Sequence, residues 1–437
     1  MKQQHTSLKS AFQTAAKTTI HWILCIFFIG FLCEYGSYIV LTIHDSHFPR
    51  SRTQDGFKAN TAPTDDSPDD VLHPYLGFVA NHATTPGIDE SFPVSNYGFE
   101  DTKDPIQKRA ADKIIIGILG GSFANHFAKF GTETLLKEMK RNPLFAGKTF
   151  VVLNLALPGY KQPQQLMTLT YLLSLGSEFD MLVNIDGFNS LALSVAENAP
   201  KNVSLYYPRH WFYLDSSLPS WQMKLRALQS MFWGSFHRQI GIWFSTPPFN
   251  KSYAMTLIGR LSELVTERIF YHNHEQLLKL KIERGSYAVT GPQKEYKNES
   301  ELFSDLASVW MRSSLTLDQL SKANGIKYFH FLQPNQYVKG SKTLSPQELK
   351  FAYSKDQPYR EPVEKGYPYL IEAGKELTKR GVFFHDYTLV FQNHAEQVYT
   401  DNCCHISKQA NADLGKIIGD QILQDLAKGR NQEGLNS

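Results

Sequence analysis

The sequence predicts an α/β protein, a three-layer α/β/α sandwich with a mainly parallel five-stranded sheet, an N-terminal transmembrane helix and a helical insertion. Short β-branched runs alternate with stretches of helical spacing, which implies parallel strands joined by right-handed crossovers. A continuous apolar segment stands near the N-terminus. A long aromatic-rich stretch separates the third predicted strand from the fourth.

Composition excludes several classes of protein. The 437 residues suffice for one large domain with insertions or for two modest ones. A net charge of +3 is too small to indicate a nucleic-acid partner, and 42% hydrophobic residues suffice for a packed core. Four cysteines, two in the apolar segment and two adjacent at Cys403–Cys404, form no disulfide framework. No zinc-ligand spacing occurs, so we expect no metal.

The N-terminus has the pattern of a signal anchor. Residues 1–19 carry three lysines and no acidic side chain, and residues 20–41 are mostly apolar, close to the ~20 residues a membrane helix needs. The lysines predict a cytoplasmic N-terminus and an extracytoplasmic body, on the periplasmic side if the source is bacterial. Glu34 interrupts the apolar run, and the remaining core also fits a signal peptide. Because no Ala-x-Ala-like site follows, we expect the anchor to be retained.

The boundaries after the anchor follow from composition. Residues 42–72 are predicted as a solvated linker, residues 73–427 as the folded domain and residues 428–437 as a tail. In the first part of the domain, from His73 to Glu100, aromatic residues alternate with glycines. This segment is predicted to be irregular chain packed over the core.

The domain itself alternates strands and helices. The predicted strands are Ile114–Leu119, Thr149–Leu155, Met181–Ile185, Ile326–Leu332 and Val382–Phe384. The predicted helices cover 123–139, 164–175, a stretch from Ser190 onward, and 407–426. An insertion over about 203–320 is rich in large aromatic side chains. One interpretation of this insertion is a lid or an acyl- or sugar-binding surface. The other, which we prefer, is a helical subdomain with a small core of its own.

Ser122 occupies the corner where the first core strand turns into a helix. Gly120 and Gly121 end the strand, and this corner presents a hydroxyl at the carboxyl edge of the sheet beside free N–H groups. That position suits a nucleophile whose transition state develops negative charge, and a simple serine N-cap is the alternative. The glycines fit neither a phosphate-binding P-loop nor a dinucleotide fingerprint, so we expect no nucleotide cofactor.

Loops at the carboxyl ends of parallel strands converge in space. Three of these loops carry Ser122, Gly159 and Asn189, and the loop 398–405 before the last helix carries Asp401 and His405. We therefore expect a nucleophile, two candidate oxyanion donors, an acid and an imidazole at one rim of the sheet.

These residues resemble the SGNH/GDSL hydrolase family, specifically its membrane-anchored bacterial members with a Gly-Gly-Ser nucleophile loop. The resemblance covers roughly residues 73–425 without the insertion and implies the flavodoxin-like SGNH hydrolase fold. It rests on four blocks in order along the chain, Gly120–Ala124, Asn154–Gly159, Asp186–Asn189 and Asp401–His405.

The resemblance implies a role for each matching residue. Ser122 would attack an ester carbonyl, His405 would carry the proton to the leaving alcohol, and Asp401 would orient the imidazole. The oxyanion hole would consist of the backbone N–H groups of Ser122 and Gly159 and the side-chain amide of Asn189. No cofactor or metal is implied.

The chain departs from the family pattern in three places. Gly121 stands where the family has Asp before the serine. Ser190 stands where many family members have Asp. The family's acid usually precedes the histidine by three positions, where this chain has Asn402. Asp401 precedes His405 by four and can reach it if the residues between them form a helical turn.

Two further side chains compete for these roles. Asp386 is an alternative acid, and His126, four residues after Ser122, is a rival base that is better placed to line the pocket.

The predicted function is a membrane-anchored extracytoplasmic serine esterase that acts on an ester-bearing lipid or an O-acylated glycan through a Ser-His-Asp acyl-enzyme mechanism. One alternative is an O-acyltransferase that acts on an envelope glycan. The other is a catalytically silent binding or scaffold protein with the same fold. Membrane contact through the N-terminal helix is expected in each case.

Overall fold

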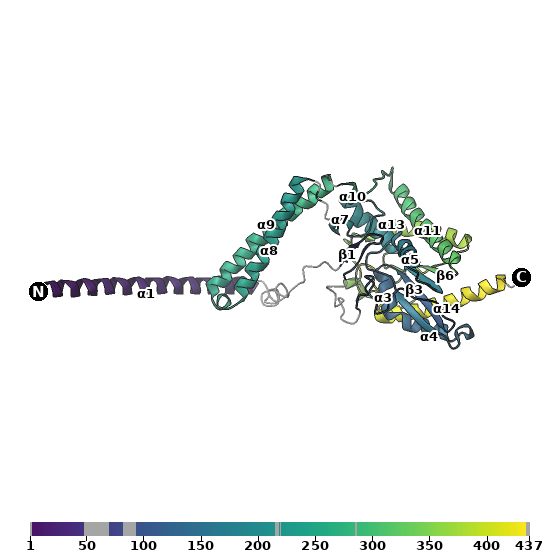
Figure 1. The fold of residues 1–437 in the computed structure, drawn as a ribbon, viewed down its shortest axis with the longest axis horizontal. Coiled ribbons are helices and arrows are strands. Elements are labelled where there is room, and N and C mark those ends of the chain that lie inside the picture. The colour runs from purple at the N-terminus through teal and green to yellow at the C-terminus, as the bar shows by residue number, and fades with distance from the viewer. Residues whose placement is uncertain are drawn as a thin grey trace. The chain divides into compact units, whose positions relative to one another are not determined.

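The computed structural model describes residues 2–47, 70–81, 93–214, 218, 220–284 and 286–433. The chain forms two compact units (Figure 1). We call residues 1–66 with 218–284 the helical unit and residues 67–217 with 285–437 the sheet unit. Of the predicted linker, residues 42–47 belong to a helix and residues 70–72 to a strand, and the rest lies outside the described residues.

The helical unit consists of one long helix and a helical hairpin. Helix α1 spans Lys2–His47 without a break and contains a 25-residue stretch, Thr19–Ile43, that is long and apolar enough to cross a membrane. The hairpin is formed by helix α8 (Trp221–Ser245), the short turn η5 (Phe249–Lys251) and helix α9 (Tyr253–Arg284). Helix α9 packs against both α8 and α1.

The sheet unit is built on a five-stranded parallel sheet in the order β4-β3-β5-β6-β7. The strands are β3 (Lys113–Gly120), β4 (Thr149–Asn154), β5 (Met181–Asp186), β6 (Lys327–Leu332) and β7 (Phe383–Asp386). This result confirms the predicted α/β class, and all five strands lie within one or two residues of their predicted positions. In this strand order β4 lies on one side of β3 and β5 on the other, so the topological switch point lies between the carboxyl ends of β3 and β5.

Helices cover both faces of the sheet. One core lies between the sheet and α5, α6, α11 and α13, and the other lies between the sheet and α3, α4 and α14. The longer helices are α3 (Ser122–Phe130), α4 (Thr132–Lys140), α5 (Gln164–Ser174), α6 (Phe188–Leu193), α11 (Glu299–Ala323), α13 (Arg360–Lys379) and α14 (Lys408–Glu433). The short elements are η2 (Pro143–Phe145), η3 (Ser194–Asn198), η4 (Ala199–Lys201), α7 (Trp211–Leu214), α10 (Tyr287–Thr290) and α12 (Glu348–Phe351).

Helix 123–139 is interrupted in the structure, contrary to the single amphipathic run that we predicted. Gly131 separates α3 from α4 because α14 approaches the backbone closely at this point. A Cβ on Gly131 would lie 2.7 Å from the carbonyl oxygen of Asn411, and one on Gly415 would lie 2.1 Å from the carbonyl oxygen of Gly131. The break therefore follows from a long-range contact that local periodicity does not report.

Part of the segment predicted as irregular is a β-hairpin. Strand β1 (Asp70–His73) pairs antiparallel with β2 (Gly77–Ala80), and Gly77 has a positive φ of 84°. Phe78 in β2 is fully buried in the first core. The aromatic residues thus do pack over the core, but from a regular element.

The predicted insertion divides between the two units. Residues 218–284 belong to the helical unit, whereas the segment that contains α11 belongs to the sheet unit. In α11, Trp310 and Leu317 are completely buried against the sheet.

Candidate active site

The two positions before Ser122 admit glycine only. Gly120 ends β3 with a positive φ of 144°, and a Cβ there would lie 2.2 Å from the carbonyl oxygen of Ile185. A Cβ on Gly121 would lie 2.1 Å from the Nδ2 atom of Asn189. Ser122 follows as the first residue of α3, and its side chain is half-buried. The residue before the serine therefore lacks a side chain because the amide of Asn189 occupies that space.

Ser122, His405 and Asp401 form a continuous chain of hydrogen bonds. The Nε2 atom of His405 lies 2.8 Å from the Oγ atom of Ser122. The Nδ1 atom of His405 is hydrogen-bonded to the Oδ2 atom of Asp401. The structure thus brings together a hydroxyl and an imidazole that are 283 residues apart in the sequence. Such an arrangement allows the imidazole to take the serine proton while the carboxylate stabilises the imidazolium.

A tight turn lets Asp401 reach His405 from four residues away. Its Oδ1 atom accepts backbone N–H groups from Cys403 at 2.9 Å, Cys404 at 3.0 Å and His405 at 3.2 Å. Burial raises the pKa of Asp401, but the hydrogen bond and charge of His405, with these N–H donors, lower it to about 2. The carboxylate therefore stays ionised beside the imidazole at neutral pH.

Of the two candidate oxyanion residues outside α3, Gly159 lies on a loop and Asn189 lies in the first turn of α6, and both segments lie beside Ser122. Asn189, in the first turn of α6, donates an Nδ2 hydrogen bond of 2.8 Å to the carbonyl oxygen of Tyr160. This bond uses one of the two N–H groups of the amide. The same carbonyl oxygen lies 3.1 Å from the position of a Cβ on Gly121. Gly159 precedes Tyr160 and has a positive φ of 85°, so its loop lies next to Ser122.

A buried carboxylate supports the segment that carries Asn189. Asp186 ends β5 and accepts hydrogen bonds from Trp310 Nε1 at 2.6 Å and Gln162 Nε2 at 3.0 Å, and it pairs with His330 Nε2 at 2.8 Å. Burial raises the pKa of Asp186, but its pairing with His330 and the other hydrogen bonds hold the pKa below its usual value. Asp186, the first residue of the block Asp186–Asn189, therefore fixes the start of the segment that carries Asn189.

The turn that carries the histidine is held from the loop after β6. Three consecutive side chains there each donate to one backbone carbonyl of the turn. The three donor and acceptor pairs are Asn335 with Cys403, Gln336 with Asp401, and Tyr337 with Asn402, each at 2.9 Å. Our reasoning from the sequence missed these residues, although they follow a predicted strand at the same sheet edge and so carried a positional signal.

A buried ion pair lies behind the same turn. Glu348 pairs with Lys342 at 2.8 Å, and both side chains are fully buried. The other oxygen of Glu348 accepts the backbone N–H groups of Val398 at 2.9 Å and Tyr399 at 3.2 Å. Burial raises the pKa of Glu348, but Lys342 and the N–H donors lower it to about 2. This pair also escaped prediction from the sequence.

The loop that contains Gly159 is bordered by two basic side chains that sequence reasoning also missed. Arg209 packs against Gly159, since a Cβ there would lie 2.7 Å from the Cδ atom of Arg209, and its guanidinium forms two 2.9 Å bonds to Glu197. Lys161 is buried and donates to the Oγ atom of Ser194 at 2.9 Å and to the carbonyl oxygen of Leu205 at 2.6 Å. Burial lowers the pKa of Lys161 to about 7, and the nearby Glu197 partly opposes the shift.

The structure does not bring the rival residues into the hydrogen-bonded chain. The ring of His126 lies 4.6 Å from the ring of His405, and burial, helped by His405 and Lys129, lowers the pKa of His126 to about 4. His126 therefore lies beside His405 as a neutral side chain. Asp386 accepts the backbone N–H of Thr388 at 2.9 Å, and it is Asp401 that pairs with His405.

The adjacent cysteines are part of the turn. Their sulfur atoms are 3.2 Å apart, and both are free thiols. The hydrogen bond shared with Cys403, followed by burial, raises the pKa of the Cys404 thiol well above its usual value.

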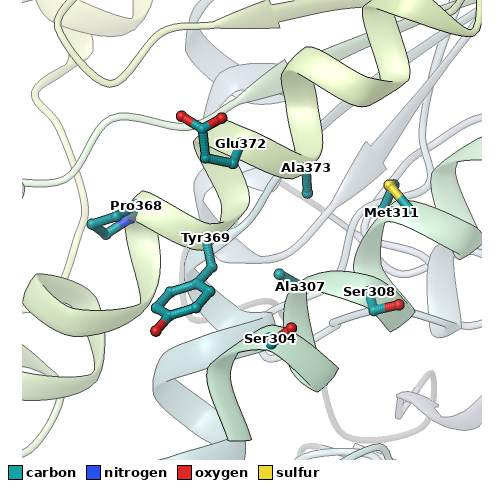
Figure 2. A pocket seen from close by; sticks show the side chains of 8 residues that line it. All are labelled: Ser304, Ala307, Ser308, Met311, Pro368, Tyr369, Glu372 and Ala373. Atoms are coloured by element: carbon teal, nitrogen blue, oxygen red, sulfur yellow. The ribbon is translucent and has the colours of Figure 1, made fainter. Parts of the chain in front are cut away.

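Figure 2 shows a pocket elsewhere in the sheet unit, between α11 and α13. Its lining residues are Ser304, Ala307, Ser308, Met311, Pro368, Tyr369, Glu372 and Ala373. None of them belongs to the four loops described above. The pocket is therefore separate from the candidate active site.

No protein-family model matches this chain, and no curated protein matches it. Within the described part of the chain, no group of three or more His, Cys, Asp or Glu side chains is placed to hold a metal ion.

Proposed function

We propose that this chain is a membrane-anchored, extracytoplasmic serine ester hydrolase of the SGNH type. The observation that carries the proposal is the unbroken chain of hydrogen bonds from Asp401 through His405 to Ser122. The resemblance of the four sequence blocks to SGNH/GDSL hydrolases supports it, as does the position of the serine at the carboxyl edge of a parallel sheet.

In the first half of the reaction, the Oγ atom of Ser122 attacks the ester carbonyl while Nε2 of His405 accepts its proton. The ionised carboxylate of Asp401 stabilises the imidazolium and fixes the tautomer of the ring. His405 then returns the proton to the departing alkoxide, which leaves as an alcohol. The acyl group stays on the Oγ atom of Ser122 as an acyl-enzyme. In the second half, the same imidazole activates a water molecule that hydrolyses the acyl-enzyme.

Negative charge that develops on the carbonyl oxygen requires hydrogen-bond donors. We assign these donors to the backbone N–H groups of Ser122 and Gly159 and to the second N–H of the Asn189 amide. In support, the segments that carry Gly159 and Asn189 both lie beside Ser122. Loss of one donor of this kind typically lowers turnover by ~10²–10³-fold.

We infer that the N-terminal helix tethers the sheet unit to a membrane. Thr19–Ile43 has the length and composition of a membrane span, and the lysines that precede it favour a cytoplasmic N-terminus. We infer that the sheet unit is extracytoplasmic, on the periplasmic side in a bacterium. Its substrate would then be an ester-bearing lipid or an O-acylated glycan near the membrane surface.

A fluorophosphonate probe tests the proposal on the full-length protein in detergent. We expect one covalent adduct on Ser122 and its loss in Ser122→Ala, whereas Ser304→Ala, an exposed serine on α11, keeps the adduct. Absence of labelling, or equal labelling of Ser122→Ala, would contradict a catalytic serine.

Turnover of p-nitrophenyl acetate distinguishes hydrolysis from transfer. We expect acetate release that depends on Ser122 without any added acceptor. Product that forms only when an oligosaccharide is present would replace hydrolysis with acyl transfer to a sugar hydroxyl.

A further inference from the structure

The α8–α9 hairpin turns polar side chains toward its own interior. Arg226 of α8 donates to the Oδ1 atom of Asn273 of α9 at 2.8 Å, and His237 shares a 3.0 Å hydrogen bond with Thr266. Asn273 is 5% exposed and Thr266 is 3% exposed. The helices are therefore joined through buried polar contacts, as helices in lipid often are.

The outer surface of the same hairpin is apolar near its tip. We define the tip half as residues 231–266. Large apolar side chains here point outward and include Phe232 at 61% exposed, Trp243 at 51% and Leu264 at 61%. Water-soluble helices show the opposite distribution, with apolar residues inside and polar residues outside.

The tip of the hairpin is attached to the candidate membrane span. The carboxylate of Glu34 in α1 accepts the Oγ–H of Ser252 and the backbone N–H groups of Tyr253 at 2.7 Å and Ala254 at 3.4 Å. The rings of Tyr38 and Tyr253 are 5.1 Å apart. Glu34 lies nine residues before the end of the span at Ile43, which corresponds to about 13 Å along the helix.

Length and charge agree with this depth. The part of α9 within the tip half, Tyr253 to Thr266, is about 20 Å long, which is close to one leaflet with its headgroups. The exposed charged side chains of the tip half are two cations, Arg238 and Lys251, and none of them is acidic. Arg238 lies seven residues before the end of α8 at Ser245, about 10 Å from the tip, where its long stem can reach lipid phosphates. Exposed acidic residues on α9 begin at Glu267, just beyond this half.

We propose that the tip half of the α8–α9 hairpin is embedded in the outer leaflet of the bilayer that α1 crosses. The inference rests on the proposed membrane span of α1, because the attachment at Glu34 sets the depth of the tip. The occupant of the apolar outer surface is therefore lipid. The chain would then be attached to the membrane by the spanning helix α1 and by the tip half of the α8–α9 hairpin, which enters the bilayer from one side.

Photolabelling from within the bilayer tests this inference. The full-length protein is reconstituted in vesicles of phosphatidylcholine and phosphatidylglycerol that contain a phospholipid with a diazirine on its acyl chain. Adducts are mapped by mass spectrometry after illumination. We expect adducts on α1 within Thr19–Ile43 and on residues 231–266, and none on α11.

A variant and a matched control isolate the hairpin. Phe232→Ser with Phe236→Ser should lower labelling of the hairpin about tenfold and leave labelling of α1 unchanged, because each exposed phenylalanine loses its transfer to lipid. Leu175→Ser with Leu389→Ser changes two exposed leucines of the sheet unit and should alter neither signal. Circular dichroism verifies that both double variants keep their helix content.

The outcomes separate this inference from the proposed anchor. Adducts on α1 alone would overturn the embedded hairpin and leave the anchor standing. Adducts on neither would overturn both, and adducts on the hairpin alone would overturn the anchor while supporting lipid contact by the hairpin. A further outcome would assign the surface to a second copy of the chain. In that case the wild-type hairpin carries no lipid adducts, and the wild-type protein is a dimer that the Phe232→Ser and Phe236→Ser double variant does not form.

Discussion

At the scale of single residues, the four-residue spacing between Asp401 and His405 is explained by the turn that joins them. One carboxylate oxygen of Asp401 accepts three successive backbone N–H groups, and the other is left for the imidazole. An acid at the position of Asn402 is not needed. The Oδ1 atom of Asn402 instead accepts a 2.9 Å hydrogen bond from Gln357.

The first prediction concerns Asp401→Asn. An asparagine can still accept the N–H groups of the turn, but its amide presents a donor to Nδ1 of His405 and favours the wrong tautomer. We expect turnover of p-nitrophenyl acetate to fall by about 10³–10⁴-fold with little change in melting temperature. Asp386→Asn, at the alternative acid, should retain full turnover. Equal losses in the two variants would contradict the assignment of the acid.

The second prediction concerns Gly121 and Asn189. Gly121→Ala introduces a Cβ at the position of the Asn189 amide, so the amide must move and turnover should fall by about 10²-fold or more. Asn189→Ala removes the same donor and should cost a similar factor. Because both changes act on one amide, the double variant should be little worse than either single variant. Multiplicative losses in this double-mutant cycle would show that the two residues act independently.

At the scale of elements, the turn that carries Asp401 and His405 depends on contacts from outside its own sequence. The side chains of Asn335, Gln336 and Tyr337 hold its carbonyls, and Glu348 holds the backbone N–H groups of Val398 and Tyr399. The loop after β6 therefore supports the position of the turn.

The third prediction concerns Glu348→Gln. This change leaves the fully buried Lys342 without its partner, so we expect a loss of about 3–5 kcal/mol in the free energy of unfolding at pH 7. Glu372→Gln, in an exposed pair with Lys375, should stay within about 0.5–1 kcal/mol of the wild type. Denaturant titration in detergent measures both. Similar stabilities for the two variants would contradict a structural role for the buried pair.

The same carboxylate predicts an acid dependence of stability. The folded state lowers the pKa of Glu348 from 4.5 to about 2, so the folded protein binds fewer protons than the unfolded chain between these values. Its contribution is present above pH 4.5 and is lost as the pH falls toward 2, by an amount on the order of 3 kcal/mol. The unfolding free energy of Glu348→Gln should therefore fall less steeply over this interval. Parallel curves would contradict the assignment.

Local patterns were sufficient to predict the strands and the serine corner, because a β-branched run that ends in two glycines carries both signals within a few residues. The order of the loops also predicted that Ser122 and His405 would meet. The break at Gly131 and the support from Asn335 to Tyr337 were not predicted. Both features depend on which distant segment of the chain packs against a given surface. Hydrophobic periodicity predicts that a surface is buried, but it does not predict which segment buries it.

At the scale of the whole molecule, the same limit explains why residues 203–320 were predicted as one insertion. Aromatic content alone does not distinguish α11, whose Trp310 packs in a core of the sheet unit, from α8, whose Trp243 points outward. To distinguish the two helices, one must know where the hydrogen-bond partners of their polar side chains lie. In α8 and α9 they lie between the helices, and this makes the outer surface of the hairpin a candidate lipid surface.

Glu34 shows how the candidate membrane span accommodates a carboxylate that interrupts an apolar run. An acidic side chain within a membrane span is costly unless it is paired, and Glu34 caps the N-terminus of α9, where free N–H groups and the helix dipole favour an anion. Leu41, two turns further along α1, is buried, which places Glu34, Tyr38 and Leu41 on one face of the helix toward the hairpin.

The last prediction follows from this cap. Glu34→Ala removes the acceptor for the first N–H groups of α9, and loss of a capping side chain typically costs about 0.5–2 kcal/mol. We expect amide hydrogen exchange of residues 252–256 to accelerate by about tenfold in detergent, because local opening of this turn becomes easier. Glu34→Gln keeps one acceptor oxygen and should give an intermediate rate, whereas exchange in β3 and β5 of the sheet unit should not change. Unaltered exchange at the start of α9 would mean that the hairpin is held by its apolar contacts with α1 alone, and the depth assigned to its tip would lose its reference point.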